Sequence, residues 1–154
     1  MTRYATEKTG MLFDRTRLAR LAARLSPSDR LCPANATLYQ RCLACPWSRD
    51  LVAQFPTPAV FARRGLGMAV LRRGRLVAGA ASYSRYRGGI EVEVDTAPAH
   101  RGHGYAMLAA AKLILTAHQQ GKIATWDAAN ETSAHIAQKL GYRVTCAYQV
   151  FTTA

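Results

Sequence analysis

The chain has 154 residues, of which 49% are hydrophobic, enough for one ordinary domain with a single core. No apolar run reaches the ~18 to 20 residues that a membrane helix needs, and the first residues lack the apolar core of a signal peptide. We therefore expect a single cytoplasmic domain over residues 1–154 and exclude a membrane-spanning or secreted protein. The net charge of +12 favours an anionic partner, such as a phosphorylated cofactor or RNA, but also fits a solvated basic face.

The four cysteines are expected to be free thiols, because cytoplasmic proteins rarely contain disulfides. Cys42 and Cys45 have the spacing of half a zinc site, and Cys32 lies near enough to be a third ligand. No fourth ligand follows at a suitable distance. We therefore expect no metal site.

Residues 12–65 are predicted to be mainly helical. From Leu12 to Leu25, apolar residues fall at helical intervals between arginines, and Ser26-Pro27-Ser28 ends this helix. Proline and capping residues mark the other helical segments. These lie at residues 36–43, in a short piece within 47–55, and from residue 57 onward.

Beyond Gly65 the apolar period changes to two, which predicts strands. An antiparallel meander is expected, with strands at residues 67–71, 76–86 and 90–96 and turns at 73–74 and 87–89. Residues 104–120, rich in Ala and Leu, predict a buried helix that ends at Gly121.

The last third of the chain is predicted to contain two more strands around a helix. A short buried strand covers residues 123–126, and Asn130 caps a helix that ends at Gly141. The inner face of this helix carries Ser133, Ile136, Ala137 and Leu140. The final strand, residues 142–151, is predicted to place one set of side chains on a single face: Val144, Cys146, Tyr148 and Val150.

This order of elements predicts an α+β fold. A mixed, mostly antiparallel central sheet is expected, flanked by helices on both faces. The long helix at 104–120 would cross over to a parallel neighbouring strand.

The loop Arg101-Gly102-His103-Gly104-Tyr105-Ala106 lies between a strand and a helix. Unpaired amides and the helix dipole favour an anion there, and glycines let the backbone approach it closely. An isolated Gly-x-Gly is also typical of a tight turn into a helix. A dinucleotide-binding loop is excluded because residues 97–101 separate the strand from the first glycine, and because position 107, where a further glycine would lie, is Met. The phosphate loop of nucleotide hydrolases is excluded because no Gly-Lys-Ser/Thr follows.

This stretch resembles the coenzyme-binding motif of the GNAT superfamily of N-acetyltransferases, Gln/Arg-x-x-Gly-x-Gly/Ala, which Arg101, Gly104 and Ala106 match. A second element of that superfamily, Asn followed by a helix that ends in Leu-Gly-aromatic, is matched from Asn130 to 140–142. Several blocks in order look like a bacterial branch filed as GNAT acetyltransferase. These are WSRDLVAQF, GGIEVEVDTAPAHRGHG, AAAKLIL and TWDAANETSAHIAQKLGY.

The resemblance implies an acetyl-CoA-dependent N-acetyltransferase with a GNAT-like fold. Residues 67–151 would form the coenzyme-binding core, and residues 12–65 would form a helical part on the acceptor side. The pyrophosphate would lie on residues 101–106. The pantetheine would be held by the backbone of Val94, Asp95 and Thr96, and by Asn130 and Ser133.

Three carboxylates, Glu91, Glu93 and Asp95, alternate along one predicted strand and should share a face unless a bulge intervenes. Like charges this close raise one another's pKa and attract a cation, which suits amine binding and proton acceptance. We expect Glu93 to be the base, directly or through a water, with Glu91 second and Asp127 third. The alternative is that these three carboxylates are simply solvated, or that they form ion pairs with arginines of the neighbouring strand and turn, such as Arg85 and Arg87.

The general acid is harder to predict. Many GNAT enzymes place a tyrosine four residues before the glycine of the Leu-Gly-aromatic element, where this chain has Ala137. Ser133, Tyr105 or solvent could protonate the leaving thiolate, or the thiolate could leave unassisted. His103 is expected to point to solvent or to a coenzyme phosphate.

The acceptor and the assembly are further expectations. The acceptor would be a small amine, a peptide or protein amino terminus, or aminoacylated RNA. The superfamily often ends in a pair of strands, whereas one strand follows Tyr142, so a partner's strand could complete the sheet in a homodimer. The alternative function is a basic nucleic-acid-binding protein that keeps the GNAT fold without turnover.

Overall fold

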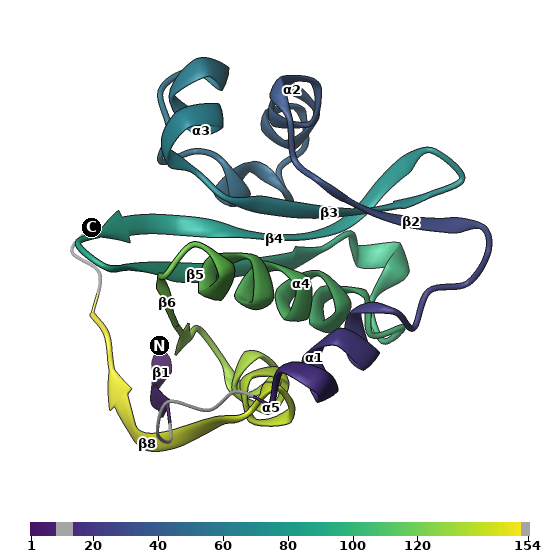
Figure 1. Ribbon diagram of the computed structural model, residues 1–154. Coiled ribbons are helices and arrows are strands. Elements are labelled where there is room, and N and C mark those ends of the chain that lie inside the picture. Colours follow the sequence, from purple (N-terminus) through teal and green to yellow (C-terminus); the bar gives the residue numbers. More distant parts are fainter. Residues whose placement is uncertain (9–13, 152–154) are drawn as a thin grey trace.

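The computed structural model describes residues 1–8 and 14–151, which form two sheets and the helices packed on them (Figure 1). The strands are β1 (Thr2–Lys8), β2 (Asp29–Pro33), β3 (Gly67–Arg72), β4 (Arg75–Tyr86), β5 (Gly89–Thr96), β6 (Ile123–Thr125), β7 (Asp127–Ala128) and β8 (Tyr142–Gln149). The helices are α1 (Arg15–Ala22), α2 (Ala36–Ala44), α3 (Pro58–Arg64), α4 (Tyr105–Gln119) and α5 (Glu131–Leu140), with 3-10 turns η1 (Arg49–Leu51) and η2 (Pro98–His100).

The larger sheet has the strand order β2-β3-β4-β5-β6 and is antiparallel except for the β5–β6 pair. Helix α4 connects these two parallel strands, as the sequence predicted. The smaller sheet has the order β7-β1-β8 and is antiparallel throughout. The predicted α+β class with a mostly antiparallel sheet is therefore confirmed.

Helices cover both faces of the larger sheet. On one face, α4 packs against β3, β4 and β5, and α1 packs against α4 (Figure 1). Fully buried side chains such as Val70, Ile90 and Leu113 fill this core. On the other face, α2, η1 and α3 enclose a second cluster that includes Tyr39 and Phe61. Five alanines in α4 keep its inner surface small, so the helix lies close to the strands.

Three strands were not predicted, β1, β2 and the two-residue β7, and one predicted helix boundary lies outside the described residues. The expected helix start at Leu12 lies outside the described residues, and α1 ends at Ala22 rather than Leu25. The piece expected within residues 47–55 is reduced to the single turn η1. None of the described helices has the length and apolar character to cross a membrane, and all four cysteines are free thiols.

The prediction that one face of β8 carries Val144, Cys146, Tyr148 and Val150 is wrong. Val144 pairs with Thr6 and Cys146 pairs with Ala5, so Thr145 is an extra residue in β8. Because Ala5 and Thr6 are consecutive in β1, their partners lie on opposite faces. The bulge leaves Val144 packed against the core and Cys146 exposed.

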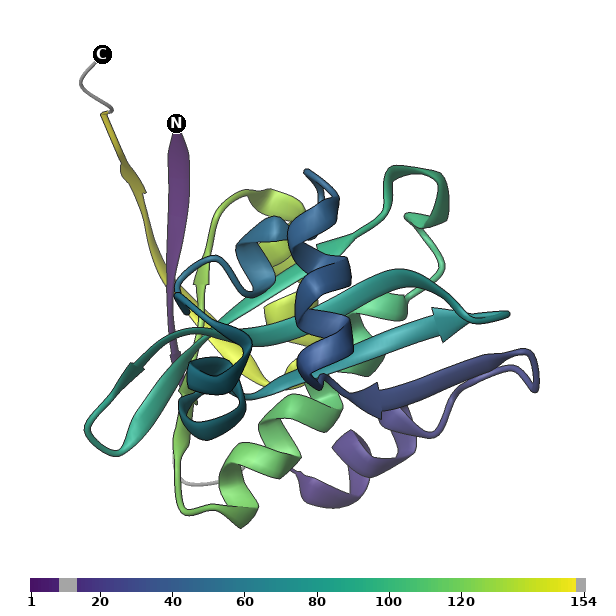
Figure 2. The ribbon, with the colours of Figure 1, turned by 90° about the horizontal axis from the view of Figure 1, so that it is seen from above.

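Strand β1 lies next to β8, where a strand from a partner subunit was predicted. It pairs with β8 from Thr2–Gln149 to Lys8–Tyr142, and the two strands run side by side (Figure 2). The same chain therefore supplies the strand that was thought to be missing. This removes the reason for expecting a homodimer.

Candidate active site

The larger sheet opens between β5 and the strands that follow α4. Strand β5 pairs with β6 only over Gly89, Ile90 and Glu91, and β7 then turns away to pair with β1. From Val92 to Thr96, β5 has no strand partner on this side within the described residues. Alternate backbone N–H and C=O groups along this edge are therefore available to a ligand.

A pocket of about 500 Å³ lies at this opening. Its walls come from the end of β5, the loop before α4 and the first turns of α5. Among the residues predicted to bind the coenzyme, it is lined by Val94, Asp95, Thr96, Arg101, Gly102, Gly104, Tyr105, Ala106, Asn130 and Ser133. His103 is not in the lining, and its ring lies 5.8 Å from that of Tyr105, centroid to centroid.

The loop is shaped by two glycines in the left-handed region. Gly102 has φ 82° and Gly104 has φ 78°, values that L side chains rarely adopt, and no atom lies within 4 Å of a Cβ at either position. The first amides of a helix have no intrahelical acceptor. Gly104, the N-cap of the 15-residue helix α4, has no side chain that could accept a hydrogen bond from them. With Arg101 beside them, these amides fit a pyrophosphate.

The α5 end of the pocket is built by a helix cap. Asn130 Oδ1 accepts a hydrogen bond from the Ser133 amide at 2.9 Å and caps α5. Ser133 Oγ accepts one from Trp126 Nε1 at 3.0 Å. Since a hydroxyl has one donor as well as its lone pairs, the Ser133 proton remains available to a ligand.

The Tyr105 hydroxyl, the other candidate proton donor, is hydrogen-bonded to Arg72 and Asp29. The oxygen accepts a hydrogen bond from Arg72 Nη1 at 2.9 Å and the proton is donated to Asp29 Oδ2 at 3.2 Å. This network ties the start of α4 to the ends of β2 and β3. Of the two side chains considered as proton donors, Ser133 is therefore the one with a free proton at the pocket.

The predicted row of carboxylates lies on one face of β5, the face that η1 covers. Strand β5 has no bulge of its own, because the extra residue at this point of the ladder is Tyr83 in β4. Glu93 lies opposite Ala81, and Asp95 lies opposite Gly79. At the end of the row, Glu91 Oε2 accepts a hydrogen bond from Ser84 Oγ at 3.2 Å.

Glu93 and Asp95 form a coupled pair with raised pKa values. Burial is the main cause for both carboxyls, and it raises the pKa of Asp95 to about 8 together with the charge of Glu93 and the hydrogen bond between the two groups. The charge of Asp50, in η1, raises both pKa values further. At neutral pH the pair therefore holds a proton between its two carboxyls.

Asp127 is bound by two side chains that were not predicted from the sequence. Its Oδ2 accepts hydrogen bonds from Arg3 Nε at 2.8 Å and from Tyr148 Oη at 2.6 Å. Both contacts occupy the Asp127 carboxylate with protein partners, and this favours Glu93 over Asp127 as the base.

The structure does not support the alternative in which the row of Glu91, Glu93 and Asp95 pairs with neighbouring arginines. Neither Arg85 nor Arg87 forms an ion pair with the row within residues 1–8 and 14–151, and Arg85 Nη1 instead donates to the Arg64 carbonyl at 3.2 Å. The row is therefore free to interact with a cationic ligand. Two charged neighbours of the row, Arg3 and Asp50, were not predicted from the sequence, and neither was Tyr148 beside Asp127.

A helix N-terminus suited to an anion, an open strand edge and Asp95 of the proton-sharing carboxyl pair line one pocket in a mixed α+β sheet. That combination is the one expected of an acetyltransferase that uses a phosphorylated pantetheine coenzyme. A family model described as GNAT acetyltransferase matches residues 1–151, and the chain belongs to this family. GNAT acetyltransferases use acetyl-CoA as the acetyl donor.

Three known proteins illustrate the similarity. "Uncharacterized N-acetyltransferase YdfB" from Bacillus subtilis (strain 168) is 29% identical over 93 residues, which are 59% of this chain and 36% of YdfB. A GCN5-related N-acetyltransferase-like protein from Streptococcus suis 89/1591 has a crystal structure that matches with a TM-score of 0.93 and 42% identity, over 96% of this chain and 59% of that one. The chain thus spans less than two thirds of either protein.

The third is yncA from Salmonella typhimurium, whose structure was solved with its cofactor acetyl-CoA. It matches with a TM-score of 0.57 and 18% identity, over 77% of this chain and 82% of that one. At this identity the match shows a shared fold.

Proposed function

We propose that the chain transfers an acetyl group from acetyl-CoA to a primary amine. The observation that carries the proposal is the pocket of about 500 Å³, which joins the glycine loop to the open edge of β5 and ends beside Asp95. Membership of the GNAT acetyltransferase family supports it. When bound, acetyl-CoA supplies a thioester whose carbonyl carbon the amine attacks.

The chain's own residues would bind the donor along the pocket. Arg101 and the amides of residues 102–106 would hold the pyrophosphate through charge and hydrogen bonds. The free backbone of Val94 to Thr96 would hold the pantetheine as an additional strand holds its neighbour, with Asn130 and Ser133 on the opposite wall.

The carboxyl pair would prepare the acceptor. At pH 7 the neutral form of a lysine amine lies about 4 to 5 kcal/mol above its cation, against about 1 kcal/mol for an α-amine of pKa ~8. Glu93 would take the proton, directly or through a water, while Asp95 donates a hydrogen bond to it. Ser133 would donate its proton to the leaving thiolate, a role supported by the Trp126 bond that leaves this proton free.

Binding of acetyl-CoA is the first test. A ligand at a hundred times its Kd adds about 2.7 kcal/mol of stability, which should raise Tm by about 5 to 11 °C in a domain of this size. Arg101→Ala should reduce the shift. No shift at millimolar acetyl-CoA would refute the proposal.

Replacement of Glu93 tests the chemical role. Glu93→Gln should lower the rate of thiol release by about 10²- to 10⁴-fold, because a general base contributes that much, and should leave the acetyl-CoA shift in Tm unchanged. Glu91→Gln is the matched variant, with a smaller effect because Ser84 already binds that carboxylate. Equal rates in wild type and Glu93→Gln would remove Glu93 from the mechanism.

The acceptor is to be identified by thiol release over a panel of amines. The panel should contain small amines, peptides with free amino termini and aminoacylated RNA. The class with the highest kcat/KM is the acceptor class.

A further inference from the structure

A second and larger hollow, of about 940 Å³, lies at the far end of the β4–β5 hairpin. One wall comes from α3 and the segment before it, another from the end of the hairpin, and a third from the turn between α4 and β6. We call it the hairpin groove. It is lined by Gln54, Phe55, Pro56, Val60, Arg63, Arg64, Tyr83, Ser84, Arg85, Tyr86, Arg87, Gly88, Gln120, Gly121 and Lys122.

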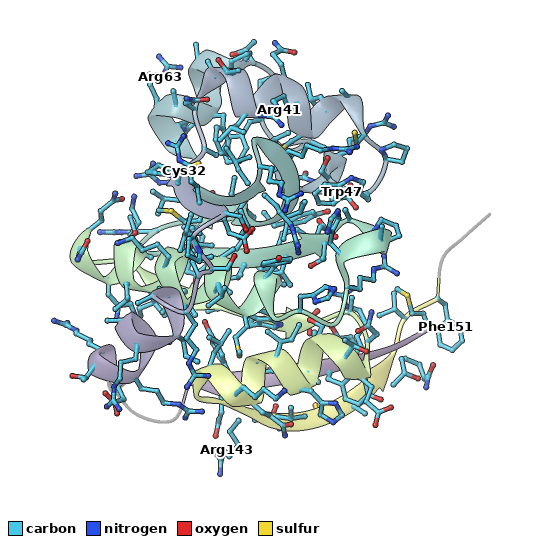
Figure 3. All side chains as sticks on the ribbon, turned by 90° about the vertical axis from the view of Figure 1, so that its right-hand side faces the viewer. Cys32, Arg41, Trp47, Arg63, Arg143 and Phe151 are labelled. Carbon is cyan, nitrogen blue, oxygen red and sulfur yellow. The ribbon has the colours of Figure 1, made fainter. Side chains whose placement is uncertain are left out.

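The hairpin groove is strongly cationic. Its lining includes Arg63, Arg64, Arg85, Arg87 and Lys122, and none of the lining residues in the described chain is acidic. Burial, and then the nearby charge of Arg85, lowers the pKa of Lys122. Figure 3 shows Arg63 in the layer of α2 and α3, at the opposite end of the molecule from Arg143. This concentration of positive charge, with no ion pair to these five side chains among residues 1–8 and 14–151, fits a ligand with several negative charges.

Two exposed tyrosines lie among these cations. Tyr83 is the bulged residue of β4 and is 37% exposed, and Tyr86 is 44% exposed. The Tyr86 ring lies directly over Gly89, where it would clash with an added Cβ, and its hydroxyl donates to Thr125 Oγ1 at 3.3 Å. The ring is therefore held in place while part of its surface stays open.

Arginines alone would suit any anion, but fixed aromatic rings between them suit a ligand that also stacks. Bases of a single strand stack on such rings regardless of sequence, while the phosphates contact the arginines. The amide side chains of Gln54 and Gln120 add donors and acceptors, which suit the 2′-hydroxyl of ribose. We propose that the hairpin groove binds single-stranded RNA.

The hairpin groove lies on the acceptor side of the sheet. Ser84 lines it and also donates its hydroxyl proton to Glu91, which is two residues from Glu93 on the same face of β5. RNA in the groove would thus lie next to the carboxylate row. The proposal rests on the groove itself and does not require acetyl transfer.

The test is fluorescence anisotropy with a labelled 12-nucleotide single-stranded RNA of mixed sequence, without acetyl-CoA, at several salt concentrations. Arg85→Gln combined with Arg87→Gln should weaken binding and reduce the slope of log K against log salt by about 1.4, since each phosphate contact to a single strand contributes about 0.7. Tyr83→Ala and Tyr86→Ala should each weaken binding by about 5- to 150-fold, because stacking contributes about 1 to 3 kcal/mol per base.

Arg17→Gln combined with Arg20→Gln is the matched control. Both residues are exposed on α1, on the other side of the sheet, and this variant loses the same charge. It should bind RNA nearly as wild type does, and the Tm of each variant shows whether it is folded. Glu93→Gln should bind RNA normally, which separates this proposal from the proposed reaction.

Three outcomes would overturn the proposal. The first is an equal loss of affinity in the α1 control and in the groove variant. The second is unchanged affinity in both tyrosine variants, which would leave only general attraction to anions. The third is equal binding of single-stranded DNA of the same sequence, which would show that the 2′-hydroxyl is not recognised.

Discussion

Asp95 is the residue whose acid–base behaviour the fold changes most. Its carboxyl lies between Glu93 and the cover formed by η1, and its Oδ2 is buried without a hydrogen-bond partner in the described part of the chain. In the unfolded chain the same carboxyl ionises near its ordinary pKa of about 4. The folded protein therefore keeps a proton that the unfolded chain has lost.

This difference gives a prediction about stability against pH. The folded pKa of Asp95 is raised to about 8, so its contribution is fully favourable below pH ~4 and is lost as pH rises toward 8. Asp95→Asn removes this loss and should stabilise the protein by on the order of 1 kcal/mol at pH 9, a moderate value because the site is partly open to solvent. Thermal melts at pH 5, 7 and 9 measure it, and a gain that does not grow with pH would contradict it.

At this scale the sequence predicted part of the site. The alternation of Glu91, Glu93 and Asp95 was enough to place them on one face, because a strand has a period of two. The partners of Asp127 could not be predicted, because Arg3 lies 124 residues away and Tyr148 lies 21 residues away. Such contacts depend on how strands are ordered in a sheet, which local patterns do not contain.

The glycines at the two ends of α4 offer a matched pair of variants. Gly104 has φ 78° and Gly121 has φ 70°, and no atom within 4 Å would meet an added Cβ at either. Gly104→Ala and Gly121→Ala should each destabilise the protein by about 1 to 2 kcal/mol, through backbone strain alone. Only Gly104→Ala should also weaken acetyl-CoA binding. Equal acetyl-CoA shifts in Tm for the two variants would show that the loop does not bind the coenzyme.

Elements with a clear apolar period were predicted well, and elements without one were missed. The meander, α4 and α5 have periods of two or about three and a half, and their bounds differ from the predicted ones by a few residues at most. β1 has the sequence TRYATEK, with Tyr4 as its one large apolar side chain, and β2 is five residues long and ends in Pro33. These strands form because neighbouring strands pair with them, a tertiary effect that outweighs local preference.

The net charge of +12 acts on the whole molecule. Self-repulsion destabilises the compact state and salt screens it, so Tm should rise between 20 and 500 mM NaCl. The variant with Arg17→Gln and Arg20→Gln, which has a charge of +10, should show a smaller rise. A Tm that is constant or falls over this range would mean that attractive ion pairs, such as Arg3–Asp127, outweigh the repulsion.

The position of β1 in the centre of the smaller sheet has a consequence for synthesis. Both of its neighbours, β7 and β8, are translated more than a hundred residues later. At about 5 to 20 residues per second, β1 leaves the ribosome roughly 6 to 24 s before β7 does. An apolar strand left unpaired that long would aggregate, whereas the threonines and charged residues of β1 keep it hydrated. The polar composition that gives β1 no apolar period is thus well suited to a strand that is made long before its two neighbours.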